Sequence, residues 1–273
     1  MAQRVNKTVY NSRGHAGHGT IVCCDALEFL RALPDDSARV VFLDPPFNLG
    51  KRYDGKRNLD RMPEEKYRRW LERVADESAR VVEPGGSLFL YHVPLWAMRF
   101  GSYLDGRLTF YQWIAISMKN GFVRGNHLYP AHYALMMFAK GKPRRFTRPR
   151  ISPQECRTCG ELIKDYGGYK PIIRRKGINL SDFWDDLSPV RHANKKNRAA
   201  NELPPLLFHR VLTMVGSRGS LYVDPFGGSG SGVIAAARRG MHFAACDIVK
   251  TNCVLMKRRL LELSMTLRRR LKK

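Results

Sequence analysis

Acidic residues and long apolar runs are scarce in this 273-residue sequence. Asp and Glu together number 24 against 48 Lys and Arg, which gives a formal charge of +24. No apolar run approaches the ~20 residues that span a bilayer, and residues 1–10 lack the apolar core of a signal peptide. The excess of cations predicts a nucleic acid or another polyanion as partner, because clustered Lys and Arg replace the counterions of a phosphate backbone. A ribosomal-type or merely soluble basic surface is the alternative.

The sequence also lacks a paired-cysteine framework. Of the six cysteines, two pairs lie close to apolar, strand-like segments, which favours reduced thiols over disulfides. Cys156 and Cys159 have the spacing of half a tetrahedral zinc site, but no second Cys-x-x-Cys follows. A turn with two reduced thiols is therefore favoured, and we assign no metal ligand.

Apolar residues make up 44% of the chain, which is enough to fill a core. Apolar runs that indicate strands alternate with helical patterns. Strands are predicted at 20–24, 39–43, 87–91, 110–118, 133–139, 219–223 and 241–246, and helices at 26–33, 63–82, 204–215, 233–239 and 251–273. This alternation predicts an α/β fold with a Rossmann-like, doubly wound, mostly parallel sheet. Composition separates residues 19–140 and 203–273 from a basic, loop-rich insertion at 141–202.

A glycine-rich turn follows the predicted strand at 219–223. It begins with Asp224, continues through Phe226 and contains Gly228 and Gly230. The turn lacks the Gly-Lys-Ser/Thr ending of a phosphate-binding loop. The next predicted strand ends at Asp247, where a carboxylate can accept hydrogen bonds from two ribose hydroxyls. Together these features indicate a nucleoside-binding half-fold, whereas the glycines alone fit any flexible strand-to-helix turn.

A second acidic motif comes earlier in the chain: Asp44-Pro45-Pro46-Phe47, the first tetrad, follows the predicted strand at 39–43, and the motif that begins at Asp224 is the second tetrad. An exocyclic amine of a nucleobase is a poor nucleophile, because its lone pair is delocalised into the ring. The Asp44 carboxylate and the Pro45 carbonyl can accept hydrogen bonds from its two protons, while Phe47 stacks on the base. The two prolines stiffen the loop. Taken alone, the same residues fit a turn that merely ends a strand.

The two tetrads in this order resemble those of the S-adenosylmethionine-dependent DNA amino-methyltransferases of the permuted, β-type order. In that family the catalytic tetrad precedes the cofactor loop, with a target-recognition region between them. The resemblance covers about residues 19–140 and 203–262. It implies a methyltransferase fold with a catalytic half at 19–140, a DNA target-recognition insertion at 141–202 and an S-adenosylmethionine-binding half at 203–273.

Carried over by residue, the resemblance implies a catalytic pocket and a cofactor site. The catalytic pocket would comprise Asp44, Pro45, Pro46 and Phe47. The cofactor site would comprise Asp25, Asp224, Phe226, Gly228, Gly230 and Asp247, with Asn201 and Glu202 from a segment that departs from the family. Within that segment, Leu203 replaces the lysine that commonly precedes Pro204.

The insertion at 141–202 is expected to contact DNA. It holds 15 Lys or Arg and 7 acids; arginine favours base edges in the major groove, and aromatic residues can fill the gap of a flipped base. The predicted DNA-binding residues, which include two from the loop after the first tetrad, are Lys51, Arg52, Arg144, Arg145, Arg174, Arg175 and Lys176. A solvated basic loop is the alternative.

The implied reaction is methyl transfer to the exocyclic amine of adenine in double-stranded DNA, after base flipping and by direct displacement. An aspartate-first tetrad resembles adenine-modifying members more than cytosine amine modifiers. The cysteine nucleophile of carbon-5 cytosine methyltransferases is not indicated, because no Pro-Cys dipeptide occurs. Methylation of the cytosine amine, methylation of an RNA base and an inactive DNA-binding protein are the alternatives.

The resemblance further implies a cytoplasmic, DNA-associated protein of prokaryotic or phage type that makes no membrane contact. A cognate restriction endonuclease and a homodimer are further expectations.

Overall fold

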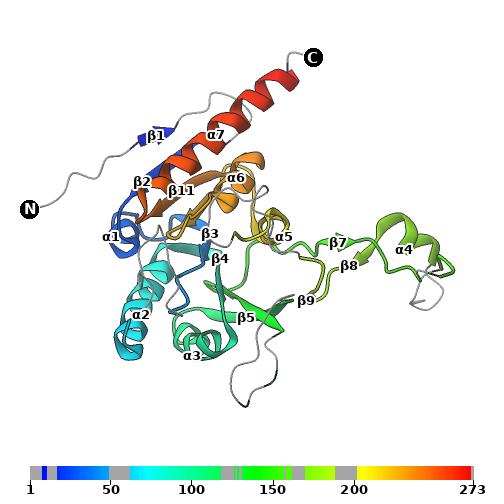
Figure 1. Cartoon of the computed structure of the whole chain (residues 1–273), viewed down its shortest axis with the longest axis horizontal. Coiled ribbons are helices and arrows are strands. Elements are labelled where there is room, and N and C mark those ends of the chain that lie inside the picture. The colour runs from blue at the N-terminus through cyan, green and yellow to red at the C-terminus, as the bar shows by residue number, and fades with distance from the viewer. Residues whose placement is uncertain are drawn as a thin grey trace, which may run out of the picture.

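The computed structural model describes residues 8–10, 17–48, 62–117, 126, 128, 131–156, 158–161, 170–187 and 202–271. The strands in this part of the chain are β1 (Thr8–Tyr10), β2 (Gly19–Cys23), β3 (Ala38–Leu43), β4 (Val82–His92), β5 (Thr109–Ser117), β6 (His132–Ala139), β7 (Arg150–Ile151), β8 (Ile178–Asn179), β9 (Phe183–Trp184), β10 (Leu221–Asp224) and β11 (His242–Asp247). Nine of them form one sheet in the order β1-β2-β11-β10-β3-β4-β6-β5-β9. Figure 1 shows this sheet with helices packed around it.

The centre of the sheet is parallel. Strands β2, β11, β10, β3 and β4 all run in the same direction. All six residues of β3 are buried, as expected for a strand whose two faces are both covered. Strand β6 runs antiparallel to both of its neighbours, β4 and β5. The predicted α/β fold with a mostly parallel sheet is therefore confirmed.

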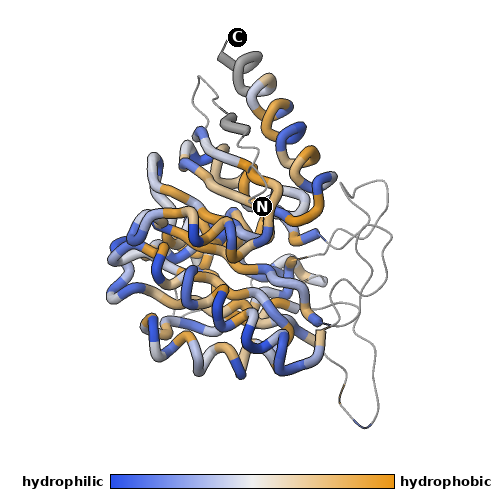
Figure 2. The backbone as a smooth tube through the Cα atoms, turned by 90° about the vertical axis from the view of Figure 1, so that its left-hand side faces the viewer, coloured by the Kyte–Doolittle hydropathy of each residue, from blue (hydrophilic) through white to orange (hydrophobic). Residues whose placement is uncertain are grey.

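Two helical layers cover the sheet. Helices α1 (Ala26–Arg31), α2 (Glu64–Val81) and α3 (Pro94–Asp105) pack on one face, and α5 (Pro205–Val215), α6 (Ser231–Arg238) and α7 (Lys250–Leu271) pack on the other. Alternate residues of one strand serve the two cores, because successive side chains in a strand point to opposite faces. Val41 and Leu43 contribute to the first core, and Val40 and Phe42 to the second. Figure 2 shows α7 rising from the body of the domain.

The structure differs from the sequence prediction at helix α3 and at the start of strand β4, and the short β1 was not predicted either. Helix α3 was not predicted; it begins with Pro94 at its first turn and buries Trp96, Phe100 and Leu104. Strand β4 begins directly after α2, so the Pro84-Gly85-Gly86 segment lies within the strand instead of before it. Gly85 has a φ of +78°, which glycine adopts without strain, and the strand continues through the irregular segment.

The described part of the insertion contains an arm and a returning strand. The arm comprises β7, β8 and α4 (Lys170–Lys176), and it projects away from the sheet (Figure 1). Strand β9 then pairs in parallel with β5 at the edge of the main sheet. The division at 141–202 stays a prediction, although β9 shows that the domain's sheet includes two residues from this zone. Along the described chain, no helix combines the length and apolarity needed to cross a membrane.

Candidate active site

Four predicted acids lie along one edge of the sheet. Asp247 ends β11 and Asp224 ends β10, while Asp44 directly follows β3 and Asp25 lies two residues beyond β2. These strands are neighbours in the order β2-β11-β10-β3 and run in parallel. The carboxyl ends of parallel strands meet at one edge, which is where open α/β sheets bind their ligands. The fold therefore brings the two tetrads together.

Asp224 is a buried carboxyl that holds the start of the glycine turn. It is 3% exposed, the Tyr222 hydroxyl donates to its Oδ2 over 3.0 Å, and the Phe226 backbone N–H donates to its Oδ1 over 3.1 Å. Burial raises the pKa of Asp224 to about 7, although both hydrogen bonds lower it. The negative charge of Asp44 also contributes to the rise, so the two carboxyls lie within electrostatic reach of each other.

The glycine turn requires residues that adopt positive φ. Gly228 has a φ of +51° and Gly230 a φ of +81°, and Gly230 is the residue that precedes α6. A Cβ on Gly230 would lie 2.7 Å from Met256 Cγ, so a side chain there would collide with α7. Asp247 fixes the turn from the next strand, because its Oδ2 accepts the Gly228 N–H over 2.9 Å while its Oδ1 accepts the Val249 N–H over 2.8 Å.

Arg259 of α7 supports the same turn and was not predicted from the sequence. Its guanidinium donates to the Ser229 carbonyl over 2.5 Å. Burial lowers the pKa of Arg259, and the charge of Glu202 opposes that effect. The predicted cofactor residue Glu202 is itself 5% exposed, so it is a buried acid close to the glycine turn. The other residue predicted from this segment, Asn201, lies outside the described residues.

Asp25 caps helix α1. Its Oδ1 accepts the Leu27 N–H over 2.8 Å and the Glu28 N–H over 3.4 Å, which satisfies two of the donors that a helix leaves unpaired at its start. The side chain is half-buried at the same edge as the other three acids. Asp25 therefore has a local structural role beside the cofactor role predicted for it.

The first tetrad lies against a cluster of aromatic rings. The Phe47 ring centroid is 6.0 Å from that of Tyr91, 4.8 Å from that of His92 and 5.7 Å from that of Tyr133. Asp44 is half-buried beside them. Burial, and after it the charge of Asp44, raises the pKa of both Tyr91 and Tyr133. These rings come from β4 and β6, and no motif in the sequence had indicated them.

Helix α2 links the two tetrads. The Trp70 ring lies edge-on to Phe226 of the glycine turn at a centroid distance of 5.9 Å. One turn earlier, Tyr67 packs 5.7 Å from Trp70 and 6.2 Å from His92, which in turn lies against Phe47. A continuous row of rings therefore connects the predicted base pocket to the predicted cofactor turn.

The predicted DNA-binding cations fall in different places. Arg144 lies beside the turn at the start of β4, where its guanidinium donates to the Pro84 carbonyl over 3.1 Å. That is the amino end of β4, and so the edge opposite to the four acids. Arg145 follows it in sequence and donates to the Thr147 hydroxyl over 3.4 Å. Lys51 and Arg52 lie outside the described residues.

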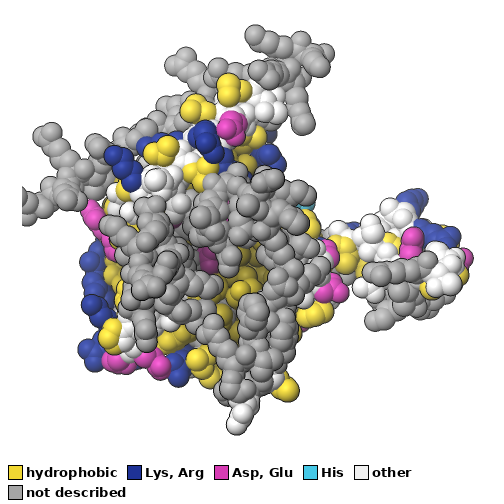
Figure 3. Space-filling model, viewed as in Figure 1, with side chains coloured by type: hydrophobic (Ala, Val, Ile, Leu, Met, Phe, Trp, Pro, Cys, Tyr) yellow, Lys and Arg dark blue, Asp and Glu magenta, His cyan; other side chains and the backbone are white. Residues whose placement is uncertain are grey.

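The remaining predicted cations gather on the arm. Arg174, Arg175 and Lys176 form the exposed last turn of α4, and Figure 3 shows basic side chains on the projecting arm. Arg174 pairs with the exposed Glu161 over 3.3 Å, a solvent-screened contact that contributes little to stability. Arg150 fixes the base of the arm by donating to the Lys176 and Gly177 carbonyls.

Cys156 and Cys159 lie in a turn of the arm. Hydrogen bonds from the backbone of Cys159 and Thr158 lower the pKa of Cys156 to about 7. All six cysteines are free thiols in the structure. Within the described ranges, no three His, Cys, Asp or Glu side chains come together as a metal site would require.

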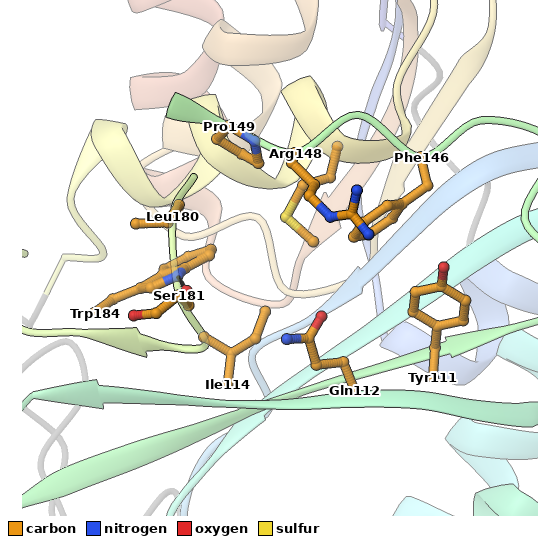
Figure 4. A pocket seen from close by; sticks show the side chains of 10 residues that line it. Tyr111, Gln112, Ile114, Phe146, Arg148, Pro149, Leu180, Ser181 and Trp184 are labelled. Carbon is orange, nitrogen blue, oxygen red and sulfur yellow. Dashed lines mark hydrogen bonds between the residues drawn. The ribbon is translucent and has the colours of Figure 1, made fainter. Parts of the chain in front are cut away.

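A cavity of about 280 Å³ lies on the α5 side of the sheet, and none of the four acids lines it. Figure 4 shows Tyr111, Phe146 and Trp184 around it, with Gln112 and Arg148 directed between them. None of the predicted catalytic or cofactor residues lines this cavity, so it is separate from the acidic edge.

The family model and the curated relatives that match this chain are all methylases or methyltransferases. The family model described as DNA methylase (N6_N4_Mtase) matches residues 38–258. The chain is 40% identical over 259 residues to the type II methyltransferase M.BamHI of Bacillus amyloliquefaciens, covering 94% of this chain and 59% of that protein. It is 28% identical to the type II methyltransferase M.HpaI of Haemophilus parainfluenzae, covering 77% and 64%. The chain therefore spans about three fifths of the length of these two relatives.

Solved structures show the same fold at low identity. The PvuII DNA methyltransferase, which is described as cytosine-N4-specific, superposes with a TM-score of 0.64 at 14% identity, covering 89% of this chain and 86% of that one. The complex of M1.HpyAVI with S-adenosylmethionine superposes with a TM-score of 0.58 at 15% identity, covering 89% and 98%. The match of the family model to most of the chain, together with 40% identity to a type II methyltransferase, shows that this chain belongs to the N6_N4_Mtase family of DNA methylases.

Proposed function

We propose that this chain transfers a methyl group from S-adenosyl-L-methionine to the exocyclic amine of a base in double-stranded DNA. The observation that carries the proposal is the placement of the Asp44 tetrad and the glycine turn on the neighbouring strands β3 and β10. An acceptor for a base amine and a turn suited to a nucleoside then face the same edge of the sheet. Membership of a DNA methylase family supports DNA as the substrate, and RNA receives no such support.

The residues of the glycine turn fit S-adenosyl-L-methionine. The positive φ values of Gly228 and Gly230 bend the backbone sharply at the end of β10, which is the kind of turn a nucleoside site needs. A carboxylate can accept about four hydrogen bonds, so Asp247, which accepts two from the backbone, keeps capacity for the ribose hydroxyls. The half-buried ring of Phe226 offers an apolar surface for the adenine. When bound, the cofactor supplies an electrophilic methyl group on its sulfonium. Buried Glu202 and half-buried Asp25 are the further residues that we propose on this side.

The base pocket is proposed at the first tetrad. Asp44 and the Pro45 carbonyl accept hydrogen bonds from the two protons of the flipped base's amine, which keeps its lone pair available for direct displacement. Phe47, packed against Tyr91 and Tyr133, presents an aromatic surface on which the base stacks. Rigid placement of both partners lowers the entropic cost of the reaction.

We propose adenine as the target base because the tetrad begins with aspartate. The DNA adenine methyltransferase YhdJ of Escherichia coli (strain K12) is 25% identical over 232 residues, covering 84% of this chain and 78% of that protein. The second candidate is the cytosine amine, because the acceptor pair would serve either base and the family's name covers both N6 and N4.

The arm is proposed to contact DNA through Arg174, Arg175 and Lys176. These cations are exposed at the end of α4, on the arm that projects from the sheet (Figure 1). The proposal does not extend to Arg144, whose guanidinium lies at the amino end of β4 and so at the edge opposite to the acids, or to its neighbour in sequence, Arg145. Lys51 and Arg52 keep their predicted role because they follow the tetrad in sequence. A restriction endonuclease partner and a homodimer stay predictions.

The direct test is incubation with methyl-labelled cofactor and unmethylated genomic DNA, followed by nucleoside mass spectrometry. N6-methyladenine is the expected product, and N4-methylcytosine would replace the adenine proposal by the cytosine one. A parallel reaction on total RNA should give no labelled nucleoside. Label in RNA alone, or 5-methylcytosine in DNA, would overturn the proposed function.

A further inference from the structure

Two buried side chains, Tyr67 of α2 and His92 of β4, connect the Asp44 tetrad to helix α2 and strand β4. The Tyr67 hydroxyl of α2 lies 2.6 Å from the Pro46 carbonyl oxygen and 2.8 Å from Nε2 of His92. The Val93 backbone N–H lies 2.8 Å from Nδ1 of the same histidine. Tyr67 is 1% and His92 0% exposed, so these contacts are shielded from water.

The direction of each hydrogen bond follows from the groups involved. A carbonyl oxygen only accepts, so the Tyr67 hydroxyl must donate to Pro46. The hydroxyl has no second proton, and it therefore accepts from Nε2 of His92. The imidazole carries its proton on Nε2, since Nδ1 accepts from the Val93 N–H. Burial lowers the pKa of His92 to about 3, which agrees with a neutral ring in this arrangement.

The tetrad depends on such external donors. Pro45 and Pro46 have no N–H, so neither residue can donate a hydrogen bond that would hold the loop. Among the described residues, none donates to the Pro45 carbonyl, whereas Tyr67 holds the next carbonyl toward α2. The ring of Pro46 fixes its φ near −65°. A hydrogen bond that holds the Pro46 carbonyl therefore also limits the direction of the Pro45 carbonyl.

His92 contacts the tetrad a second time. Its ring lies 4.8 Å from the Phe47 ring at an interplanar angle of 31°. The same imidazole thus supports the ring proposed to stack on the base, and it orients the hydroxyl that holds Pro46. One buried histidine links both halves of the proposed pocket.

We propose that Tyr67 and His92 are positioning residues, which hold the Pro46 carbonyl against α2 so that the Pro45 carbonyl faces the amine of the flipped base. Neither residue touches the reacting atoms. The inference rests on the proposed function, because it assigns the Pro45 carbonyl to the substrate amine.

The first test compares Tyr67→Phe with Tyr103→Phe. Tyr103 is the control, since its hydroxyl likewise makes a side-chain hydrogen bond, over 2.9 Å to Asp76 of α2, but far along that helix from the tetrad. With saturating cofactor and DNA, Tyr67→Phe should lower the single-turnover methylation rate about ten- to hundredfold, because small misplacement of a reacting group is costly. Its cofactor Kd and its KM for DNA should stay within threefold of wild type. Tyr103→Phe should keep the wild-type rate.

A wild-type rate for Tyr67→Phe would overturn the proposal. So would a loss of cofactor affinity and of thermal stability in proportion to the loss of rate, because that pattern is expected of a purely structural residue. Methylation of no base by the wild-type protein would instead refute the proposed function.

A second pair of variants tests the histidine. The amide of His92→Gln has an N–H that can donate to Tyr67, whereas His92→Leu has none. We compare the two variants under conditions in which both are folded, as checked by their Tm. We expect the methylation rate of His92→Gln to be at least tenfold higher than that of His92→Leu. Equal rates for two folded variants would remove His92 from the proposal.

Discussion

The buried carboxyl of Asp224 should make the stability of this fold depend on pH. Burial raises its pKa from 3.8 to about 7, and at 3% exposure little solvent screens the group. The folded state then holds the proton more tightly than the unfolded chain does. The stability that this provides is complete below pH 3.8 and is lost as pH rises through about 7.

The size of the effect follows from the pKa difference. One pKa unit corresponds to about 1.4 kcal/mol, so a difference of about three units amounts to about 4 kcal/mol over the whole range. Between pH 5 and pH 8, the linkage relation gives a loss of about 2.5 kcal/mol from this one group. Asp224→Asn keeps the shape and the acceptor for the Phe226 N–H but does not titrate, so it should lack this loss.

The assay is urea unfolding, followed by circular dichroism at pH 5, 6, 7 and 8. Other carboxyls contribute to the slope of both proteins and cancel in the difference between them. Asp105→Asn is the matched control, because it removes an exposed carboxylate that likewise accepts a backbone N–H, from Phe110 over 3.1 Å. Parallel curves of unfolding free energy against pH for wild type and Asp224→Asn would refute the reasoning.

Three further predictions test the proposed roles. Asp44→Ala should abolish methyl transfer yet leave cofactor affinity within a few-fold by calorimetry, because the carboxylate acts on the base amine; turnover at the wild-type rate would contradict the role. Asp247→Ala should weaken cofactor binding about tenfold, since two ribose hydroxyls lose an acceptor and the glycine turn loses a hydrogen bond; unchanged affinity would remove it from the site. Replacing Arg174 and Arg175 together by Ala should weaken DNA binding and lower the slope of log K against log salt by about two, with cofactor affinity unchanged. Arg144→Ala is the control for this double variant. If Arg144→Ala weakened DNA binding as much as the double variant does, the proposal that the arm contacts DNA would be refuted.

Much of the fold could be predicted from hydrophobic periodicity. Strand β3 and helix α2 appeared within one or two residues of their predicted bounds, because their apolar residues repeat with periods that local backbone geometry imposes. Helix α3 and strand β9 were missed for different reasons. Helix α3 follows β4 without a polar turn, and β9 has two residues, too few to show a period. Trp184 of β9 is 1% exposed only because the chain returns to the main sheet and pairs with the edge of β5.

The sequence by itself determined which residues carry the proposed chemistry, because each tetrad is a continuous stretch whose acids, prolines and glycines constrain the backbone locally. Only the tertiary structure decided what surrounds them. Tyr67, His92 and Arg259 reach the two loops from α2, β4 and α7, and contacts between residues so far apart in the chain leave no periodic trace. The placement of Arg144 at the edge opposite to the acids also depends on the tertiary structure, because it bonds to Pro84 at the amino end of β4, which runs parallel to β3.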